Sequence, residues 1–367
     1  MALASHTPTT WDTILSTTMH NYRKSLTDNI FGSRPLLEYL MSNGRVRTLD
    51  GGISIVEPLL LGPGEAHSYG PWEQIQVNAV AGISAAQFAW RQLVATIIIS
   101  GLEEAQNNGK EQMINLVEAK VMQAEETLKN VLSKMVYGTM GGSALPTDFT
   151  SFTVLIDATG AAGGITPAAA PAPENQWRSP TWNASTNTGT DALGNAITMP
   201  GTALTSPYDG AELERALRHM WVLSSDGGSD HVDAIFADAS WFEAYEASLT
   251  PQVRYTDTTK ANLGFQNLMF KNVPIYWDPD APVGTALGLN SKYIGLTLHS
   301  ERNFTQSPFT ANLSGGVSSN TNANPGSSAA TPAAYAIDAR VSFITTFGNT
   351  TVRQRRRNFK ITGATFS

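Results

Sequence analysis

Residues 114–135 carry the clearest periodic pattern in the chain. Their apolar positions recur at alternating steps of three and four and are Ile114, Val117, Val121, Ala124, Leu128, Val131 and Met135. Such steps place side chains on one face of an α-helix, so the pattern predicts an amphipathic helix over about residues 108–137, capped by Asn108 and ended by Gly138. A coiled coil is the alternative, although the stripe is short for one.

Acidic residues accompany this helix at a regular spacing. They are Glu104, Glu111, Glu118 and Glu125, each seven residues after the last. Seven residues are close to two helical turns, so the carboxylates are expected to form one solvated line along the helix surface.

Residues 45–100 have the pattern of strands interrupted by glycine. Breaks at Asp50-Gly51-Gly52 and Gly62-Pro63-Gly64 and the apolar return run ISAAQFAWRQLVATIIIS predict a long hairpin-like loop. In RVRTLDGGISIVEP, residues 45–58, nothing nearby in the sequence covers the apolar side chains. The residues that we expect to contact a partner surface are Ile53, Ile55, Leu59, Phe88 and Trp90.

The flanking regions predict further elements. Residues 1–44 are polar apart from RPLLEYLMSNG, which predicts a short helix that stops at Asn43-Gly44. The segments GAELERALRHMWVL and SWFEAYEASL predict helices, and DAIFAD and VPIYWD predict strands. Residues 158–206 are rich in Ala, Gly, Pro and Thr and are interpreted as a polar surface insertion. Near the C-terminus, Gly348-Asn349 predicts a hairpin turn between two strands.

Composition narrows the possible functions. The 367 residues include 24 basic and 31 acidic side chains, so the net charge of -7 argues against a protein that grips nucleic acid over its whole surface. The chain contains no cysteine, which excludes disulfides and thiolate metal sites. Its longest apolar run, LVATIIIS, is far short of the roughly 20 residues of a membrane helix, so no membrane contact is expected.

Two acidic clusters are candidates for chemistry. In SDGGSDHVD, a metal could be held by Asp226, Asp230, His231 and Asp233. In WDPD, Asp278 and Asp280 could act as an acid-base pair. Glycine and proline beside aspartate are more typical of turns, so we interpret both clusters as structural. We therefore predict no enzymatic activity and no cofactor.

The strongest run of charge is VRQRRRNFK near the C-terminus. On a strand, Arg353, Arg355 and Arg357 would share one face, and Arg356 would point the other way. Two interpretations are open for this basic row. Its guanidinium groups could pair with acidic surfaces such as the Glu104 to Glu125 line, within the chain or between subunits, or they could contact packaged nucleic acid. Pairing is favoured, because the net charge is acidic.

Four stretches resemble one family of proteins in their order and over most of the chain. They are DNIFGSRPLLEYLMSNGRVRTLDGGISIVEPL, ISAAQFAWRQLVATIIISGLEEAQNNGKEQMINLVEAK, FKNVPIYWDPDAP and FGNTTVRQRRRNF. In these stretches the chain is similar to the major capsid proteins of tailed double-stranded DNA bacteriophages, which have the Hong Kong 97-type fold. The resemblance implies an α+β fold with an N-terminal arm, an extended β loop, a long spine helix, a peripheral β-sheet domain and an axial α/β domain.

The same resemblance implies how the chain is divided. The arm would span residues 1–44 and the extended loop 45–100. The peripheral domain with the spine helix would comprise 101–144 and 301–367, and the axial domain 145–300, with the polar insertion at 158–206. In such proteins the extended loop lies across a neighbouring subunit, which would cover the apolar side chains of residues 45–100.

Function and partners are also implied. The expected product is an icosahedral shell of pentamers and hexamers around phage double-stranded DNA, which the shell contacts weakly and locally, assembled in the host bacterial cytoplasm and found in the virion capsid. No lysine occurs between Lys24 and Lys110, so covalent cross-linking through the loop is not expected. A separate scaffolding protein, a portal and a cement protein are the expected partners. An encapsulin-like compartment around an enzyme cargo is the alternative, and an enzyme using the aspartate clusters ranks last.

Overall fold

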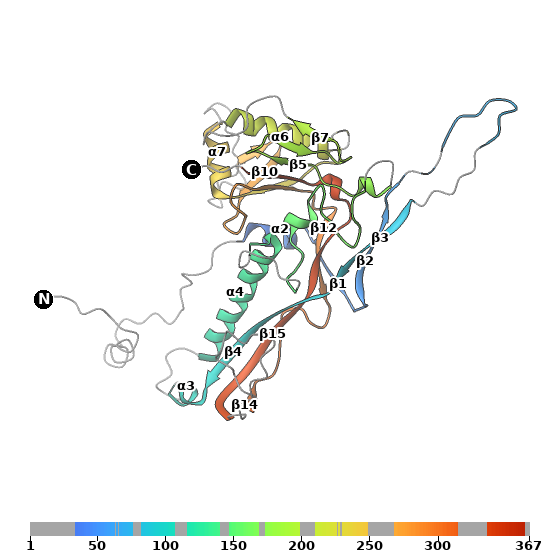
Figure 1. The fold of residues 1–367 in the computed structure, drawn as a ribbon. Helices are drawn as coiled ribbons and strands as arrows, with labels where there is room; N and C mark the ends of the chain where they lie inside the picture. The colour runs from blue at the N-terminus through green and yellow to red at the C-terminus, as the bar shows by residue number, and fades with distance from the viewer. Residues whose placement is uncertain are drawn as a thin grey trace, which may run out of the picture. The chain divides into compact units, whose positions relative to one another are not determined.

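A computed structural model of the chain describes residues 34–62, 64, 66–75, 82–106, 116–139, 147–168, 173–198, 210–225, 227, 230–248, 268–314 and 336–363. Helices and strands are mixed along it, as the α+β prediction requires (Figure 1). The chain divides into two compact units. One comprises Met1–Phe31, Thr96–Glu126 and Pro308–Phe343, and the other comprises Gly32–Ala95, Thr127–Ser307 and Ile344–Ser367.

The smaller unit contains the end of β4 (Arg91–Ser100), the short helix α3 (Gly101–Gln106) and the start of α4 (Leu116–Tyr137). In the same unit, β14 (Thr310–Ser314) pairs in antiparallel with the start of β15 (Ala336–Val352). Lys120 on α4 donates hydrogen bonds to the Glu103 carboxylate at 2.6 Å and to the Ile98 carbonyl at 2.9 Å. These contacts join the helix to the end of β4.

The larger unit is built on an eight-stranded sheet. Its strands, in spatial order, are β7 (Ala196–Thr198), β6 (Thr188–Thr190), β5 (Thr181–Asn183), β16 (Phe359–Thr362), β11 (Ala286–Leu289), β8 (Ala234–Ala237), β10 (Val273–Trp277) and β9 (Leu268–Phe270). The helices α6 (Gly210–Ser224) and α7 (Ala239–Ser248) contribute Leu213, Leu217 and Trp241 to a core that also contains Ile275 and Phe359. Leu213, Ala216, Leu217 and Met220 follow the helical spacing that turns one face of α6 toward this core.

A second sheet of the same unit is centred on β12 (Ile294–His299). This strand lies between β1 (Val46–Leu49), which is parallel to it, and the second half of β15, which is antiparallel and also pairs with β13 (Thr305–Gln306). The helix α2 (Pro35–Ser42) precedes β1 and buries Leu36, Leu37 and Leu40. Gly44 ends the turn after this helix in a left-handed conformation, with φ of 62°, as the sequence predicts.

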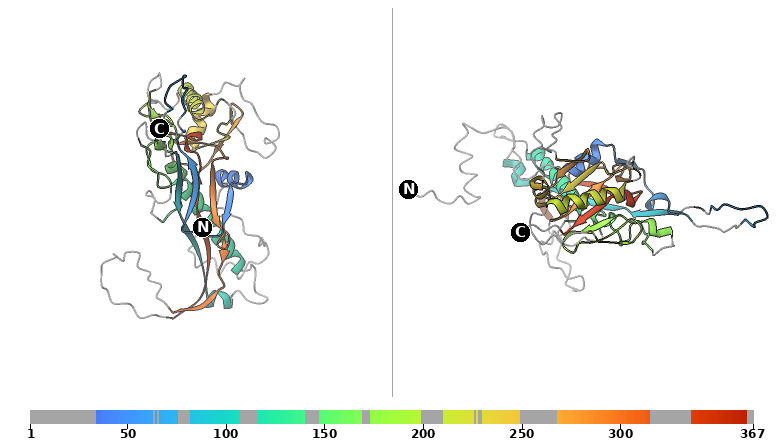
Figure 2. Two further views of the ribbon diagram at one scale, coloured as in Figure 1. Left: turned by 90° about the vertical axis from the view of Figure 1, so that its right-hand side faces the viewer. Right: turned by 90° about the horizontal axis from the view of Figure 1, so that it is seen from above.

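The predicted loop over residues 45–100 contains a two-stranded ribbon. Strands β2 (Ser54–Leu60) and β3 (Ile83–Ala89) pair in antiparallel, so that Ile55 faces Phe88 and Leu60 faces Ile83. In Figure 1 and in the right-hand view of Figure 2, residues 66–75 reach beyond the end of the paired strands. We call residues 62–75 the tip of this hairpin.

Two sequence predictions are wrong in this region and one is confirmed. Gly348-Asn349 does not form a hairpin turn, because β15 runs through it without interruption. A Cβ at Gly348 would lie 2.3 Å from the carbonyl oxygen of Thr297, so glycine serves close packing against β12 instead of a turn. Gly138 ends α4 as predicted, with φ of 79°, whereas the expected cap Asn108 lies outside the described residues.

The interpretation of residues 158–206 as a polar surface insertion is also wrong. This segment supplies β5, β6 and β7, and β5 pairs in parallel with β16. Trp177 and Trp182 are only 2% and 3% exposed. Two large aromatic side chains therefore anchor a segment whose average composition is that of a surface loop.

Candidate assembly surface

The inner face of the hairpin packs on its own chain. Ile55, Leu59 and Phe88 are 0%, 7% and 3% exposed. The cover includes the turn at Gly163, whose carbonyl accepts a hydrogen bond from the Gln87 N–H at 2.8 Å. A Cβ at Gly163 would lie 2.6 Å from the Cβ of Ala86, so the two segments are in close contact. Three of the five residues predicted to need a partner surface are therefore already buried, which corrects that prediction.

The other two predicted contact residues lie at the base of the hairpin. Trp90 is half-buried, stacks on Phe347 with ring centroids 5.0 Å apart and donates an indole hydrogen bond to the Gly52 carbonyl at 2.9 Å. Ile53 is fully exposed. Of the five residues, Ile53 alone keeps its whole side chain available to a partner.

The outer face of the hairpin is apolar and uncovered. Val56, Leu60 and Ile83 are 48%, 79% and 84% exposed, and Leu60 lies opposite Ile83 across the ribbon. A strand with apolar residues on both faces is typical of strands that are covered on both sides. The run ISIVEPLLL therefore held a signal that the sequence analysis did not use: one face is covered within the chain, and the other needs a second cover.

The tip extends this apolar surface. Tyr69, Trp72 and Ile75 are 66%, 104% and 59% exposed, so three large apolar side chains stand in solvent on one short segment. Trp72 has a φ of 73°, a conformation that non-glycine residues rarely adopt. Contiguous exposed apolar surface of this kind marks sites of protein association. We call Ile53, Val56, Leu60 and Ile83 the outer face, and the outer face together with the tip is the candidate assembly surface.

The predicted row of Arg353, Arg355 and Arg357 does not exist as one face. The strand β15 ends at Val352, and residues 355–357 form a short 3-10 helix, η5, in which the alternation of a strand is lost. Arg355 is fully buried and Arg357 is 6% exposed. Neither guanidinium is available to DNA or to another subunit, so that part of the prediction is wrong.

Arg355 instead ties together a loop of its own chain. Its guanidinium donates to the carbonyls of Leu155 at 2.7 Å, Asp157 at 2.8 Å, Gly160 at 2.9 Å and Trp177 at 2.9 Å. Burial lowers the pKa of Arg355 to about 10, so the group remains charged at neutral pH. One buried cation thus satisfies several carbonyls that would otherwise be left without a donor.

Lys360 holds the same loop from another side. Its ammonium donates to the Asp157 carboxylate at 2.8 Å and to the Thr153 carbonyl at 2.9 Å. Burial alone would raise the pKa of Asp157, but the hydrogen bond and charge of Lys360 lower it to about 2. Because this loop leads directly to Gly163, Arg355 and Lys360 fix the surface on which the inner face of the hairpin rests.

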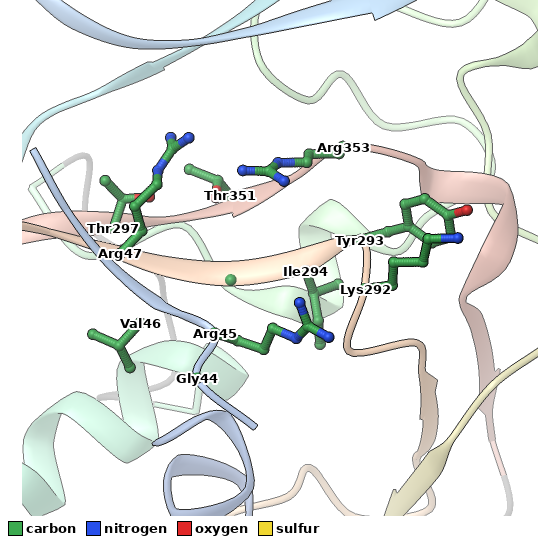
Figure 3. Close-up of a pocket in the computed structure, with 11 residues that line it drawn as sticks. Gly44, Arg45, Val46, Arg47, Lys292, Tyr293, Ile294, Thr297, Thr351 and Arg353 are labelled. Atoms are coloured by element: carbon green, nitrogen blue, oxygen red, sulfur yellow. The ribbon is translucent and has the colours of Figure 1, made fainter. Parts of the chain in front are cut away.

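Arg353 joins the hairpin to the second sheet. It donates to the Glu57 carboxylate at 3.1 Å, and Arg47 donates to the other oxygen of the same carboxylate. Glu57 is 3% exposed and lies on the inner face of β2, between Ile55 and Leu59. The pairing favoured for Arg353 therefore occurs within the chain. Figure 3 shows Arg47 and Arg353 beside a pocket that also contains Arg45 and Lys292.

The aspartates weighed as candidates for chemistry have structural partners. Asp278 is buried and accepts hydrogen bonds from the Tyr137 hydroxyl at 2.9 Å and the Leu36 N–H at 3.3 Å, and burial raises its pKa. Asp233 accepts from the Tyr39 hydroxyl, and Asp230 accepts from Asn290 at 3.1 Å. Within the described residues, no group of three or more His, Asp or Glu side chains could hold a metal. Asp226 lies outside them.

The acidic line on α4 can be followed only in part. Glu118 and Glu125 are exposed, which agrees with a solvated face, whereas Glu111 and the side chain of Glu104 lie outside the described residues. A role for this line in subunit contact stays a prediction. None of the described helices is long and apolar enough to span a membrane.

Comparison with solved structures identifies the fold. The chain is similar to the capsid of cyanophage A-1(L), with a TM-score of 0.61 and 14% identity over 95% of this chain and 97% of that one. It is also similar to the capsid of a native GTA particle, with a TM-score of 0.57 and 9% identity over 95% and 96% of the two chains. A Mycobacterium phage Ogopogo chain matches with a TM-score of 0.53 and 10% identity over 98% and 99%.

No protein-family model and no curated protein sequence matches the chain. The capsid fold expected from the sequence resemblance is confirmed by the solved structures. Its division into arm, extended loop, peripheral domain and axial domain stays a prediction.

Proposed function

We propose that the chain is a structural major capsid protein that self-assembles into pentamers and hexamers of an icosahedral shell enclosing phage double-stranded DNA. The observation that carries this proposal is the uncovered outer face of the hairpin, in a chain whose fold is shared with phage capsids. Leu60 and Ile83 lie on a ribbon whose other face is already packed, so refolding the hairpin onto its own chain would expose Ile55 and Phe88 in their place.

A neighbouring copy is the cover that the outer face requires. Specific interfaces bury roughly 800 Å² on each partner, and a two-stranded ribbon with an aromatic tip can contribute a large part of such an area. A shell multiplies this contact around every capsomer, which explains why a subunit would keep a large apolar surface in solvent. This function needs no catalytic group, in keeping with the structural partners of Asp233 and Asp278.

The contents and partners follow from the same proposal. With a net charge of -7, and with Arg355 and Arg357 buried, contact with packaged DNA would be weak and local. The shell would assemble in the host bacterial cytoplasm around a scaffolding protein, incorporate a portal, and be reinforced in the virion by a cement protein.

Light scattering on the purified full chain after size-exclusion chromatography tests the proposal. We expect particles whose mass corresponds to many copies, formed alone or with a co-expressed scaffolding protein. A mass of one chain at every concentration, with and without scaffold, would contradict it. Particles that enclose a folded enzyme instead of scaffold or DNA would favour an encapsulin-like compartment.

A further inference from the structure

A groove with basic side chains runs past the base of the hairpin. One pocket of about 280 Å³ is lined by Arg45, Arg47, Lys292, Tyr293 and Arg353, among others (Figure 3). A second pocket, of about 390 Å³, shares Lys292, Tyr293 and Arg353 with the first and continues to Leu60, Gln354 and Arg356. The two pockets therefore form one continuous groove, and this groove lies within the larger unit.

The groove holds more positive than negative charge. Glu57 compensates Arg47 and Arg353, but within the described residues no carboxylate pairs with Arg45, Lys292 or Arg356 at ion-pair distance. The Nε atoms of Arg45 and Arg356 are buried without a hydrogen-bond acceptor in the described part of the chain. A buried donor without an acceptor costs about 1–3 kcal/mol, so these two arginines favour a ligand that brings acceptor oxygens.

The lining also has an apolar component. Pro58 and Leu60 of β2 border the second pocket, and both are exposed. A site for free phosphate or for a DNA backbone would be expected to offer cations and polar donors alone. The mixture of cations and apolar side chains suits a peptide that carries both carboxylate and aromatic groups.

The tip of the hairpin has this complementary chemistry. Trp72 and Glu73 are adjacent and exposed, and Glu65 lies on the same segment of the sequence. No lysine or arginine occurs between Arg47 and Arg91, so the hairpin carries no basic side chain of its own apart from His67. The Glu73 carboxylate accepts the Gly70 N–H at 2.7 Å, which holds the turn that presents the indole of Trp72.

We propose that the groove of one copy binds the tip of the hairpin of a second copy. In this arrangement Glu73 pairs with Arg45, Lys292 and Arg356, and Trp72 packs on Pro58 and Leu60. The side chain of Trp72 is completely exposed in the single chain, so the tip is free to reach a neighbour. This inference rests on the proposed shell function and specifies which two surfaces meet in the shell.

Disulfide trapping tests the contact, because the chain has no cysteine that would give a background. The full chain with Gln74→Cys at the tip and Gln354→Cys in the groove is assembled, oxidised and run on a non-reducing denaturing gel. We expect a ladder of covalently linked multimers that collapses on reduction. The matched control replaces Gln354→Cys with Ala196→Cys, on the exposed strand β7, and is expected to stay monomeric on the gel.

Charge reversal tests the energetics of the same contact. Glu73→Lys and Lys292→Glu are each expected to reduce the yield of particles at least tenfold, while the thermal midpoint of the unassembled chain stays unchanged. The double variant restores opposite charges at the contact and is expected to recover most of the yield.

The outcomes separate the two proposals. If wild-type particles form, but the cysteine pair gives no ladder and the single reversals assemble normally, the inference is overturned and the shell function stands. If no wild-type particles form under any condition, both fall. Single reversals that lose assembly without recovery in the double variant would show that the two charges do not meet, and they also overturn the inference.

Discussion

At the scale of single residues, the most informative side chain is Arg355. A run of arginines looks like a surface for phosphate, yet this guanidinium is fully buried and bonded to backbone carbonyls of residues 155–177. Arginine suits such a place because its planar group offers five donors in a fixed geometry and keeps its charge when buried.

We predict that Arg355→Met strongly destabilises the chain. The substitution preserves much of the apolar volume but leaves four or more carbonyls without a donor, for a loss of roughly 3–5 kcal/mol in the free energy of unfolding. Thermal and denaturant unfolding of the unassembled chain, followed by circular dichroism, measures it. The matched control is Arg356→Met, for which a change of about 1 kcal/mol or less is expected. Equal midpoints for the two variants would refute the structural role of Arg355.

The role of Arg355 could not be predicted from the sequence. The period-two interpretation assumed that the strand continues past Val352, and nothing in VRQRRRNFK marks the change to a 3-10 helix. The acceptors lie almost 200 residues away in the chain, so only the tertiary fold brings them together. The turn character of Asp278, in contrast, followed from its neighbouring proline, and its buried hydrogen bonds agree with that interpretation.

At the scale of elements, the hairpin separates stability from assembly on its two faces. Ile55 and Phe88 belong to the fold of the chain, whereas Leu60 and Ile83 belong to the proposed contact between copies. Successive residues of a strand point to opposite faces, so substitutions a few positions apart should have opposite consequences.

We predict that Leu60→Ser combined with Ile83→Ser leaves the unassembled chain folded but abolishes particles. Exposed substitutions of this kind change the free energy of unfolding by about 0.5 kcal/mol or less each. The matched variant Ile55→Ala removes buried methyl groups and should cost about 2 kcal/mol or more. Unfolding midpoints and light scattering on the same samples measure both effects. If the outer-face variant forms particles at the wild-type yield, the outer face is not an interface.

Element prediction succeeded where periodicity was strong. The helix α4, with its end at Gly138, and the helix α6 follow from steps of three and four in the sequence. It failed over residues 158–206, because composition averaged over the segment concealed two tryptophans that anchor strands of the main sheet. It failed again at Gly348, where local turn statistics were overridden by close packing between β12 and β15.

At the scale of the whole molecule, the order of parts along the chain carried more information than any motif. The capsid fold was expected from the succession of polar start, long β loop, long helix and mixed region, and the solved capsids share it at 14% identity or less. What the sequence could not show is that the loop is half covered by its own chain. That division arises from the turn at Gly163, which follows the loop by many residues.

The central claim is that copies of this chain cover one another's hairpins. Electron cryomicroscopy of the assembled particle tests it most directly, because a map at side-chain detail shows what lies against Leu60 and Ile83. We expect pentamers and hexamers in which every outer face, together with its tip, is buried against an adjacent copy. Closed particles in which the hairpin stands free in solvent, or a chain that forms no particles at all, would contradict the account.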